Sequence, residues 1–219
     1  MRGQPAPVLK VTDLIAKSFA KFLNRVQNEH SDALSSFLIE SEWERYKGDA
    51  EGVLKSFEMS GYAIMPRDPS ETMIAKADAS FQASKSLLGP RGVRIYVTTI
   101  YRSMVDAWMS TRDPQLITDI ISMALSRSSN PGRREAASMM DNSFRRYAKT
   151  ASEILTDLEK TGFLVLPDEA TPHMISAAVA QTAEQRANAK MIGADPKYLK
   201  SIYENLLAAR PDDCRAPKA

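Results

Sequence analysis

The sequence is poor in the residues that most often mark a chemical site. It contains one cysteine, Cys214, and two histidines, His30 and His173, among 219 residues. A single thiol cannot form an internal disulfide, and no Cys/His cluster has the spacing of a structural zinc site. We therefore expect no metal and no cofactor, and the low cysteine count favours the reducing cytoplasm.

Long apolar runs and a large net charge are missing as well. No run of about 18 apolar residues occurs, and the first residues lack the apolar core of a signal peptide, so we expect no membrane span and no export. Lys plus Arg number 29 against 27 for Asp plus Glu, a net charge of +2. Strong non-specific nucleic-acid binding needs a larger basic excess or a tight basic patch.

Common catalytic motifs are absent. The sequence has no phosphate-loop, dinucleotide-binding, zinc-protease or serine-hydrolase motif, and neither histidine has a nucleophile or carboxylate at a recognisable spacing. GPRGVR at residues 89–94 could hold an anion on backbone N–H groups, but a loop with a basic edge is the simpler interpretation. Cys214 falls in a polar segment that resembles a tail. We therefore predict that the protein is not an enzyme.

What is present is an internal repeat. SGYAIMPRDPSETMI at residues 60–74 returns as TGFLVLPDEATPHMI at 161–175, which is 101 positions later. The same shift aligns residues 41–80 with 142–181 without a gap, and eleven of the aligned pairs are identical. We predict two tandem repeats of about 100 residues, 10–111 and 112–210, related by a pseudo-twofold axis, and a C-terminal tail over 211–219.

The repeats are expected to be mainly helical, which makes the fold class all-α. Apolar residues spaced by three and four predict helices over 10–28, 32–60 and 94–110, and over 114–128, 132–161 and 196–210. Gly61 and Gly162 follow the long helices, where a left-handed residue often ends a helix. Helices should start again at Asp68, as N-cap of a capping box with Glu71, and at Thr171.

Two short extended segments lie between these helices. YAIM at 62–65 and FLVL at 163–166 are each followed by a proline, which stops regular structure. Each is too short to be a stable strand alone, and a buried extended backbone must still satisfy its N–H and C=O groups. We expect the two segments to pair with each other as an antiparallel two-stranded ribbon.

One family resemblance is visible at this point. The order of a glycine, an aromatic residue, several aliphatic residues and a proline, with Met73-Ile74 and then Ile100-Tyr101, resembles a segment found in many bacterial and phage proteins. The second repeat departs from it near its end, where IYENL stands in place of IYRSM. The resemblance implies a bacterial source and carries no function with it.

The repeats differ most in charge along the second helix. Residues 127–149 of the second repeat are basic, whereas the aligned stretch of the first is acidic, with Glu44 opposite Arg145. The basic cluster could pair with the acidic stretch inside the molecule, contact nucleic acid, or meet an acidic surface of a protein partner. Its members are the candidate partner-binding residues Arg127, Arg133, Arg134, Arg145, Arg146 and Lys149.

The sequence thus favours a non-enzymatic binding or regulatory protein that acts where its repeats diverge. A protein partner is expected, and a nucleic-acid-binding regulator that uses the basic helix of the second repeat is the alternative. The eleven methionines sit mostly at apolar positions. They are expected to fill the core, or alternatively to form an adaptable groove for a partner helix.

Overall fold

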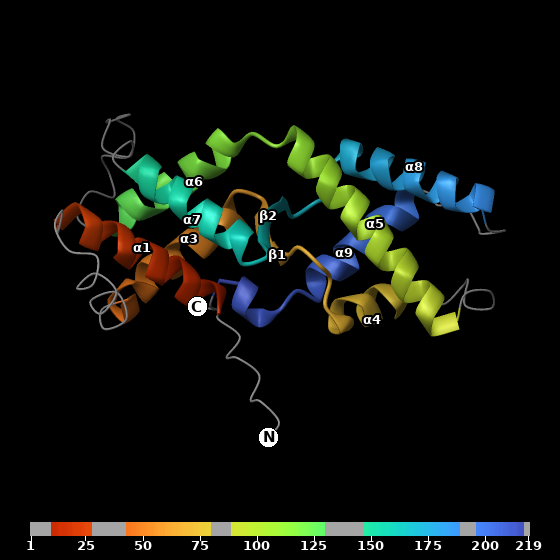
Figure 1. Ribbon diagram of the computed structural model, residues 1–219, viewed down its shortest axis with the longest axis horizontal. Coiled ribbons are helices and arrows are strands. Elements are labelled where there is room, and N and C mark those ends of the chain that lie inside the picture. The colour runs from red at the N-terminus through yellow and green to blue at the C-terminus, as the bar shows by residue number, and fades with distance from the viewer. Residues whose placement is uncertain (1–9, 28–42, 80–88, 130–146, 189–195, 217–219) are drawn as a thin grey trace, which may run out of the picture. The chain divides into compact units, whose positions relative to one another are not determined.

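A computed structural model describes residues 10–27, 43–79, 89–129, 147–188 and 196–216 (Figure 1). The described chain is mostly helical with one two-stranded antiparallel sheet, which confirms the all-α class. Its elements are α1 (Val11–Gln27), η1 (Trp43–Tyr46), α3 (Lys47–Met59), β1 (Tyr62–Pro66), α4 (Glu71–Ala79), α5 (Gly89–Thr111), α6 (Pro114–Ser129), α7 (Ala148–Lys160), β2 (Phe163–Pro167), α8 (Pro172–Asn188), α9 (Pro196–Ala208) and η6 (Asp212–Cys214).

The chain folds into two compact units, and each unit takes segments from both halves of the sequence. Unit 1 comprises Met1–Phe57, Gln115–Thr161 and Asp213–Ala219, whereas unit 2 comprises Glu58–Pro114 and Gly162–Asp212. The compact units therefore do not coincide with the sequence halves 10–111 and 112–210. The described part of the predicted tail, residues 211–216, contains a short helix, Asp212–Cys214, and Cys214 is buried.

The two extended segments pair as expected. β1 and β2 are antiparallel, with Ile64 opposite Val165 at the centre of the ribbon. These two residues are also partners in the 101-position alignment, so the register is symmetric about them: Tyr62 faces Pro167, and Phe163 faces Pro66. Matching hydrogen bonds close the two ends, from Asp168 N to Gly61 O at 2.9 Å and from Arg67 N to Gly162 O at 2.7 Å.

Side chains cover the outer edges of this ribbon. Hydrogen-bonded and non-hydrogen-bonded pairs alternate along antiparallel strands, so positions 64, 66, 165 and 167 direct their backbone groups outwards. Tyr101 Oη donates to the Pro66 carbonyl at 2.6 Å, Tyr203 Oη to the Pro167 carbonyl at 2.6 Å, and Trp108 Nε1 to the Val165 carbonyl at 2.9 Å. The two prolines cost the ladder nothing, because their nitrogens also face outwards.

Both strands are entered through a glycine in the left-handed region. Gly61 has φ of 76° and Gly162 has φ of 86°, and they are the only described residues with positive φ. Each directly precedes a strand and follows the last turn of α3 or α7, as the Gly61 N to Glu58 O hydrogen bond of 3.2 Å shows for α3. The expected helix-ending role of these glycines is therefore confirmed.

The helix start in the first half differs from the sequence prediction. Asp68 is not the N-cap of α4, because Ser70 Oγ accepts from Met73 N at 3.3 Å and the helix begins at Glu71. Thr171 Oγ1 accepts from Met174 N at the same 3.3 Å, as predicted for α8. The two caps therefore stand at aligned positions, and Asp68 is left available for an ion pair with Arg102.

Each unit has its own packing. In unit 2, α5 packs along α8 and α4 along α9 (Figure 1), around a buried core that includes Met65, Met73, Met104 and Met174. In unit 1, α1 packs on α7, with Ser18 Oγ donating to Asp157 Oδ2 at 2.8 Å. Those four methionines fill the core, as expected for adaptable apolar side chains.

Candidate functional site

Of the six predicted partner-binding residues, the structure describes two. Arg127 lies near the end of α6 and Lys149 in the first turn of α7, and both side chains are exposed. None of the ion pairs within the described ranges involves either residue. The other four, Arg133, Arg134, Arg145 and Arg146, lie outside the described residues.

The face of α6 that carries Arg127 also exposes two large apolar side chains. Leu116 is 48% exposed and Met123 is 42% exposed. Positions 116, 123 and 127 are separated by seven and four residues, so they follow one line along the helix. The opposite face is buried through Ile117, Ile121 and Leu125. We call the exposed line of Leu116, Met123 and Arg127 the α6 face.

The corresponding line of α1 is different in chemistry and in environment. Aligning Thr12 with Thr118 places Lys10, Lys17 and Lys21 opposite the three residues of the α6 face. Lys17 Nζ lies 5.2 Å from the centre of the Trp43 ring, and Lys47 Nζ lies 4.6 Å from it. In α1 this line is therefore basic and partly engaged with an aromatic ring, whereas in α6 it is apolar with one cation.

The structure also describes His173, Cys214 and residues 89–94, which the sequence offers as candidates for chemistry. His173 is exposed in the first turn of α8, and His30 lies outside the described residues. Cys214 is 2% exposed, so the thiol is buried and not on a free tail. Residues 89–94 belong to helix α5 and do not form a loop. Within the described ranges no three His, Cys, Asp or Glu side chains are grouped to hold a metal ion.

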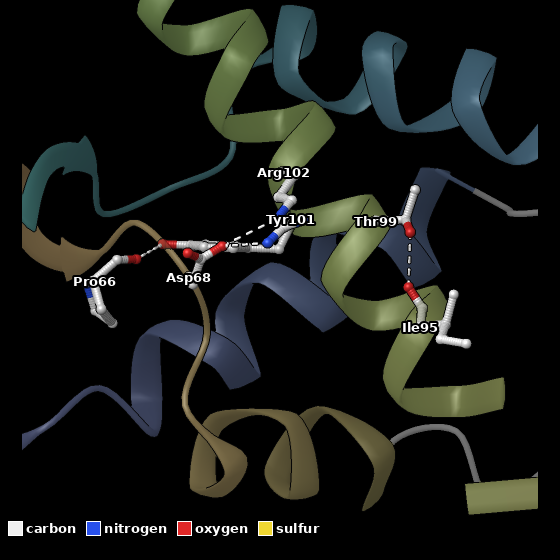
Figure 2. Close-up of polar contacts among 6 residues, drawn as sticks. All are labelled: Pro66, Asp68, Ile95, Thr99, Tyr101 and Arg102. Atoms are coloured by element: carbon white, nitrogen blue, oxygen red, sulfur yellow. Dashed lines mark hydrogen bonds and ion pairs between the residues drawn. The ribbon is translucent and has the colours of Figure 1, made fainter. Parts of the chain in front are cut away.

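A small polar network holds the first strand-to-helix junction in place. Arg102 donates to Asp68 Oδ1 from Nε at 3.0 Å and from Nη2 at 2.7 Å, next to the Tyr101 hydroxyl that reaches Pro66 (Figure 2). One turn earlier, Thr99 Oγ1 donates back to the Ile95 carbonyl at 2.8 Å. Arg102 and Asp68 are both largely exposed, so their ion pair orients the junction more than it stabilises it.

The second junction has a different set of charges. Glu169 stands where the first half has Asp68, and Glu204 where it has Arg102. Lys200 Nζ lies between these carboxylates, 3.6 Å from Glu169 Oε2 and 3.8 Å from Glu204 Oε1. The first half thus has a direct acid–base pair at this junction, whereas the second half has two acids that share one lysine.

The two tyrosines with shifted pKa values belong to the scaffold of unit 2. Burial raises the pKa of Tyr203 strongly, the Asp168 carboxylate raises it further, and the Arg210 guanidinium opposes both. Burial also raises the pKa of Tyr62, helped by Asp113. Neither shift prepares a catalytic base, because a raised pKa keeps the phenol neutral and, for Tyr203, its proton is donated to a backbone carbonyl.

Sequence reasoning missed the exposed apolar part of the α6 face. Leu116 and Met123 occur in a helix whose apolar residues extend around much of its circumference, so the sequence pattern predicts that they are buried in the core. A comparison of the aligned segments would have identified them, because lysines occupy both aligned positions: Lys10 just before α1 and Lys17 within it.

Comparison with known proteins gave no match to a family model, to a curated protein or to a solved structure. None of the described helices is both long enough and apolar enough to cross a membrane.

Proposed function

We propose that this protein is a non-enzymatic binding or regulatory protein whose α6 face docks on an acidic surface of a protein partner. The observation that carries the proposal is the exposure of Leu116 and Met123 in line with Arg127. Apolar side chains that a partner can desolvate supply affinity, and a flanking arginine steers an acidic partner and fixes its register.

The charge of the neighbouring sequence supports an acidic partner. Arg127 begins the basic cluster, and Lys149 closes it on α7. A cluster of this sign next to an apolar line is complementary to an apolar patch rimmed by Asp or Glu. Methionine suits such a contact because its unbranched side chain adapts to the surface that it meets.

Nucleic acid is the alternative partner, because the same basic cluster could contact phosphates. The α6 face favours a protein partner over nucleic acid. The apolar side chains of Leu116 and Met123 offer no polar group to a phosphate backbone, whereas an apolar patch on a protein can bury them. A gel-shift titration at about 50 and about 200 mM salt separates the two, because phosphate contacts must weaken steeply over that range. If the protein binds DNA or RNA in a salt-sensitive way that requires Arg127, the partner is a nucleic acid and not a protein.

The direct test is quantitative affinity purification from the organism that encodes the protein. The α6 variant carries Leu116→Glu, Met123→Glu and Arg127→Glu, and the control carries Met59→Glu, since Met59 is 74% exposed on α3. Partners of the wild type should be retained by the control and reduced about tenfold or more in the α6 variant. Equal recovery from all three proteins, with matching circular dichroism spectra, would contradict the proposal.

The proposal includes a bacterial cytoplasmic location. It is supported by the use of a single cysteine in the chain, Cys214, which is buried and forms no disulfide.

A further inference from the structure

The charges along the α6 face stand in a fixed order, an acid followed by a base. Asp119 lies three residues after Leu116 on the flank of the line, and Arg127 lies at its end in the last turn of α6. The eight residues from Asp119 to Arg127 span about 12 Å of helix. Asp119 Oδ1 accepts from Gln115 Nε2 at 2.8 Å, which is a neutral donor. No ion pair among the described residues involves Asp119 or Arg127, so each charge can meet one on a partner.

The spacing of the apolar residues selects the shape of the partner. Leu116 and Met123 are seven residues apart, about 10.5 Å along the axis of α6. A second helix repeats its side chains on one face at the same interval, so two of its apolar residues can pack on both, as in a coiled coil. An extended segment repeats its side chains on one face at roughly 6.7 Å and 13.4 Å, and neither distance matches. A helix also offers no sheet edge to pair the backbone of an added strand.

The order of the charges selects the direction of the partner helix. Because of the helix dipole, Asp and Glu are favoured in the first turn of a helix, and Lys and Arg in the last. A helix antiparallel to α6 therefore brings its acidic start to Arg127 and its basic end towards Asp119. A parallel helix of the same kind would place like charges together at both points. Antiparallel packing also sets opposite ends of the two helix dipoles side by side.

We propose that the partner contacts the α6 face through an amphipathic helix that runs antiparallel to α6. Two of its apolar residues, seven positions apart, pack on Leu116 and Met123. Its acidic first turn lies at Arg127, and a Lys or Arg about eight residues later lies at Asp119. This inference rests on the proposed function, and it adds the structural element, direction and charge order of the partner.

The experiment titrates the full-length protein with fluorescent peptides and follows their anisotropy. The test peptide is about 18 residues long, or about five turns, and a hydrocarbon staple on its outer face keeps it helical. It carries Glu in its first turn, two Leu residues seven positions apart and a Lys eight positions after the Glu. A control peptide of the same composition has its second Leu two positions further on, nearly on the opposite face. The test peptide should bind about tenfold or more tightly than the control, because the control loses one apolar contact.

A photocrosslinker at the first residue of the test peptide reports its direction. Mass spectrometry of the crosslinked protein should place it at the Arg127 end of α6. The Asp119→Arg/Arg127→Asp variant keeps the net charge and both apolar residues but exchanges the two charges. In this variant, the crosslink should move to the Leu116 end, because the acidic start of the peptide follows the arginine. Matching circular dichroism spectra verify that the variant is folded.

The proposal is overturned if the test peptide does not bind, or if the spacing control binds equally well. A crosslink at the Leu116 end of the wild type, or a crosslink that does not move in the charge-exchange variant, overturns it as well. The α6 variant used in affinity purification separates these failures from failure of the proposed function. If cellular partners still depend on the α6 face while the peptide test fails, the docking role of that face stands and the antiparallel helix is wrong.

Discussion

Replacing Gly162 by alanine should destabilise the protein, whereas the same replacement at Gly52 should stabilise it. A Cβ added at either glycine would meet no atom within 4 Å, so neither change creates a clash. Gly162 has φ of +86°, where an alanine costs about 1–2 kcal/mol. Gly52 lies inside α3 with no positive φ, where alanine is favoured over glycine by about 0.5–1 kcal/mol.

Thermal unfolding followed by circular dichroism measures both effects. For a chain of this size, 1 kcal/mol corresponds to a shift in Tm of about 2–4 °C. Gly162→Ala should therefore melt roughly 2–8 °C below the wild type, and Gly52→Ala roughly 1–4 °C above it. A Gly162→Ala protein that melts at or above the wild-type temperature, while Gly52→Ala rises as expected, would refute the left-handed helix end.

Three further predictions concern the scaffold of unit 2. In urea denaturation, Ser70→Ala should lower the free energy of unfolding by about 1 kcal/mol, because Ser70 caps α4. Asp68→Ala should lower it by less, because Asp68 forms only an exposed ion pair. A larger loss for Asp68→Ala than for Ser70→Ala would indicate that Asp68 is the cap. Trp108→Phe should cost about 1–3 kcal/mol in the same assay, because it leaves the Val165 carbonyl without its donor, and a neutral result would mean that this edge is solvated. The folded pKa of Tyr203 lies above the unfolded value of about 10, so the stability that Tyr203 contributes is present below about pH 10 and falls as the pH rises further. Tyr203→Phe should therefore reduce the loss of Tm between about pH 9 and about pH 11. If Tm falls with pH equally steeply in the variant and the wild type, the raised pKa of Tyr203 is contradicted.

Much of the fold could be predicted because its signals are local or repeated. Gly61 and Gly162 mark helix ends through their backbone freedom, and each is followed by an apolar run closed by proline. Two short strands with no other partner favour each other, and the ribbon centred on Ile64 and Val165 confirms that expectation. The local sequence signals and the need to satisfy buried backbone N–H and C=O groups were sufficient to predict this ribbon.

The remainder depends on contacts that are distant in sequence. The sequence offers Asp68 as N-cap of a capping box with Glu71, but Arg102, 34 positions later, binds its carboxylate, and Ser70 caps the helix. Cys214 has polar neighbours in sequence, and only the packing of the chain end shows that its thiol is buried. The grouping of segments from both halves into each compact unit likewise follows from tertiary packing.

The candidate site was predicted in part for the same reason. Charge is visible in a sequence, so the basic cluster that begins at Arg127 was found. Exposure cannot be read from the sequence in the same way. In a helix with apolar residues on most sides, the surrounding elements decide which face is buried, and in α6 Leu116 and Met123 remain exposed to solvent.

The binding role of the α6 face is tested most directly by site-specific photocrosslinking in the organism that encodes the protein. A benzophenone amino acid is placed at position 123 on α6 and, as the control, at position 59, the most exposed large apolar residue of the described chain. Proposed docking on α6 predicts a discrete crosslinked protein from position 123, with an acidic contact surface, that is absent from position 59. The same background pattern from both positions, or a crosslink from position 123 to nucleic acid alone, would contradict it.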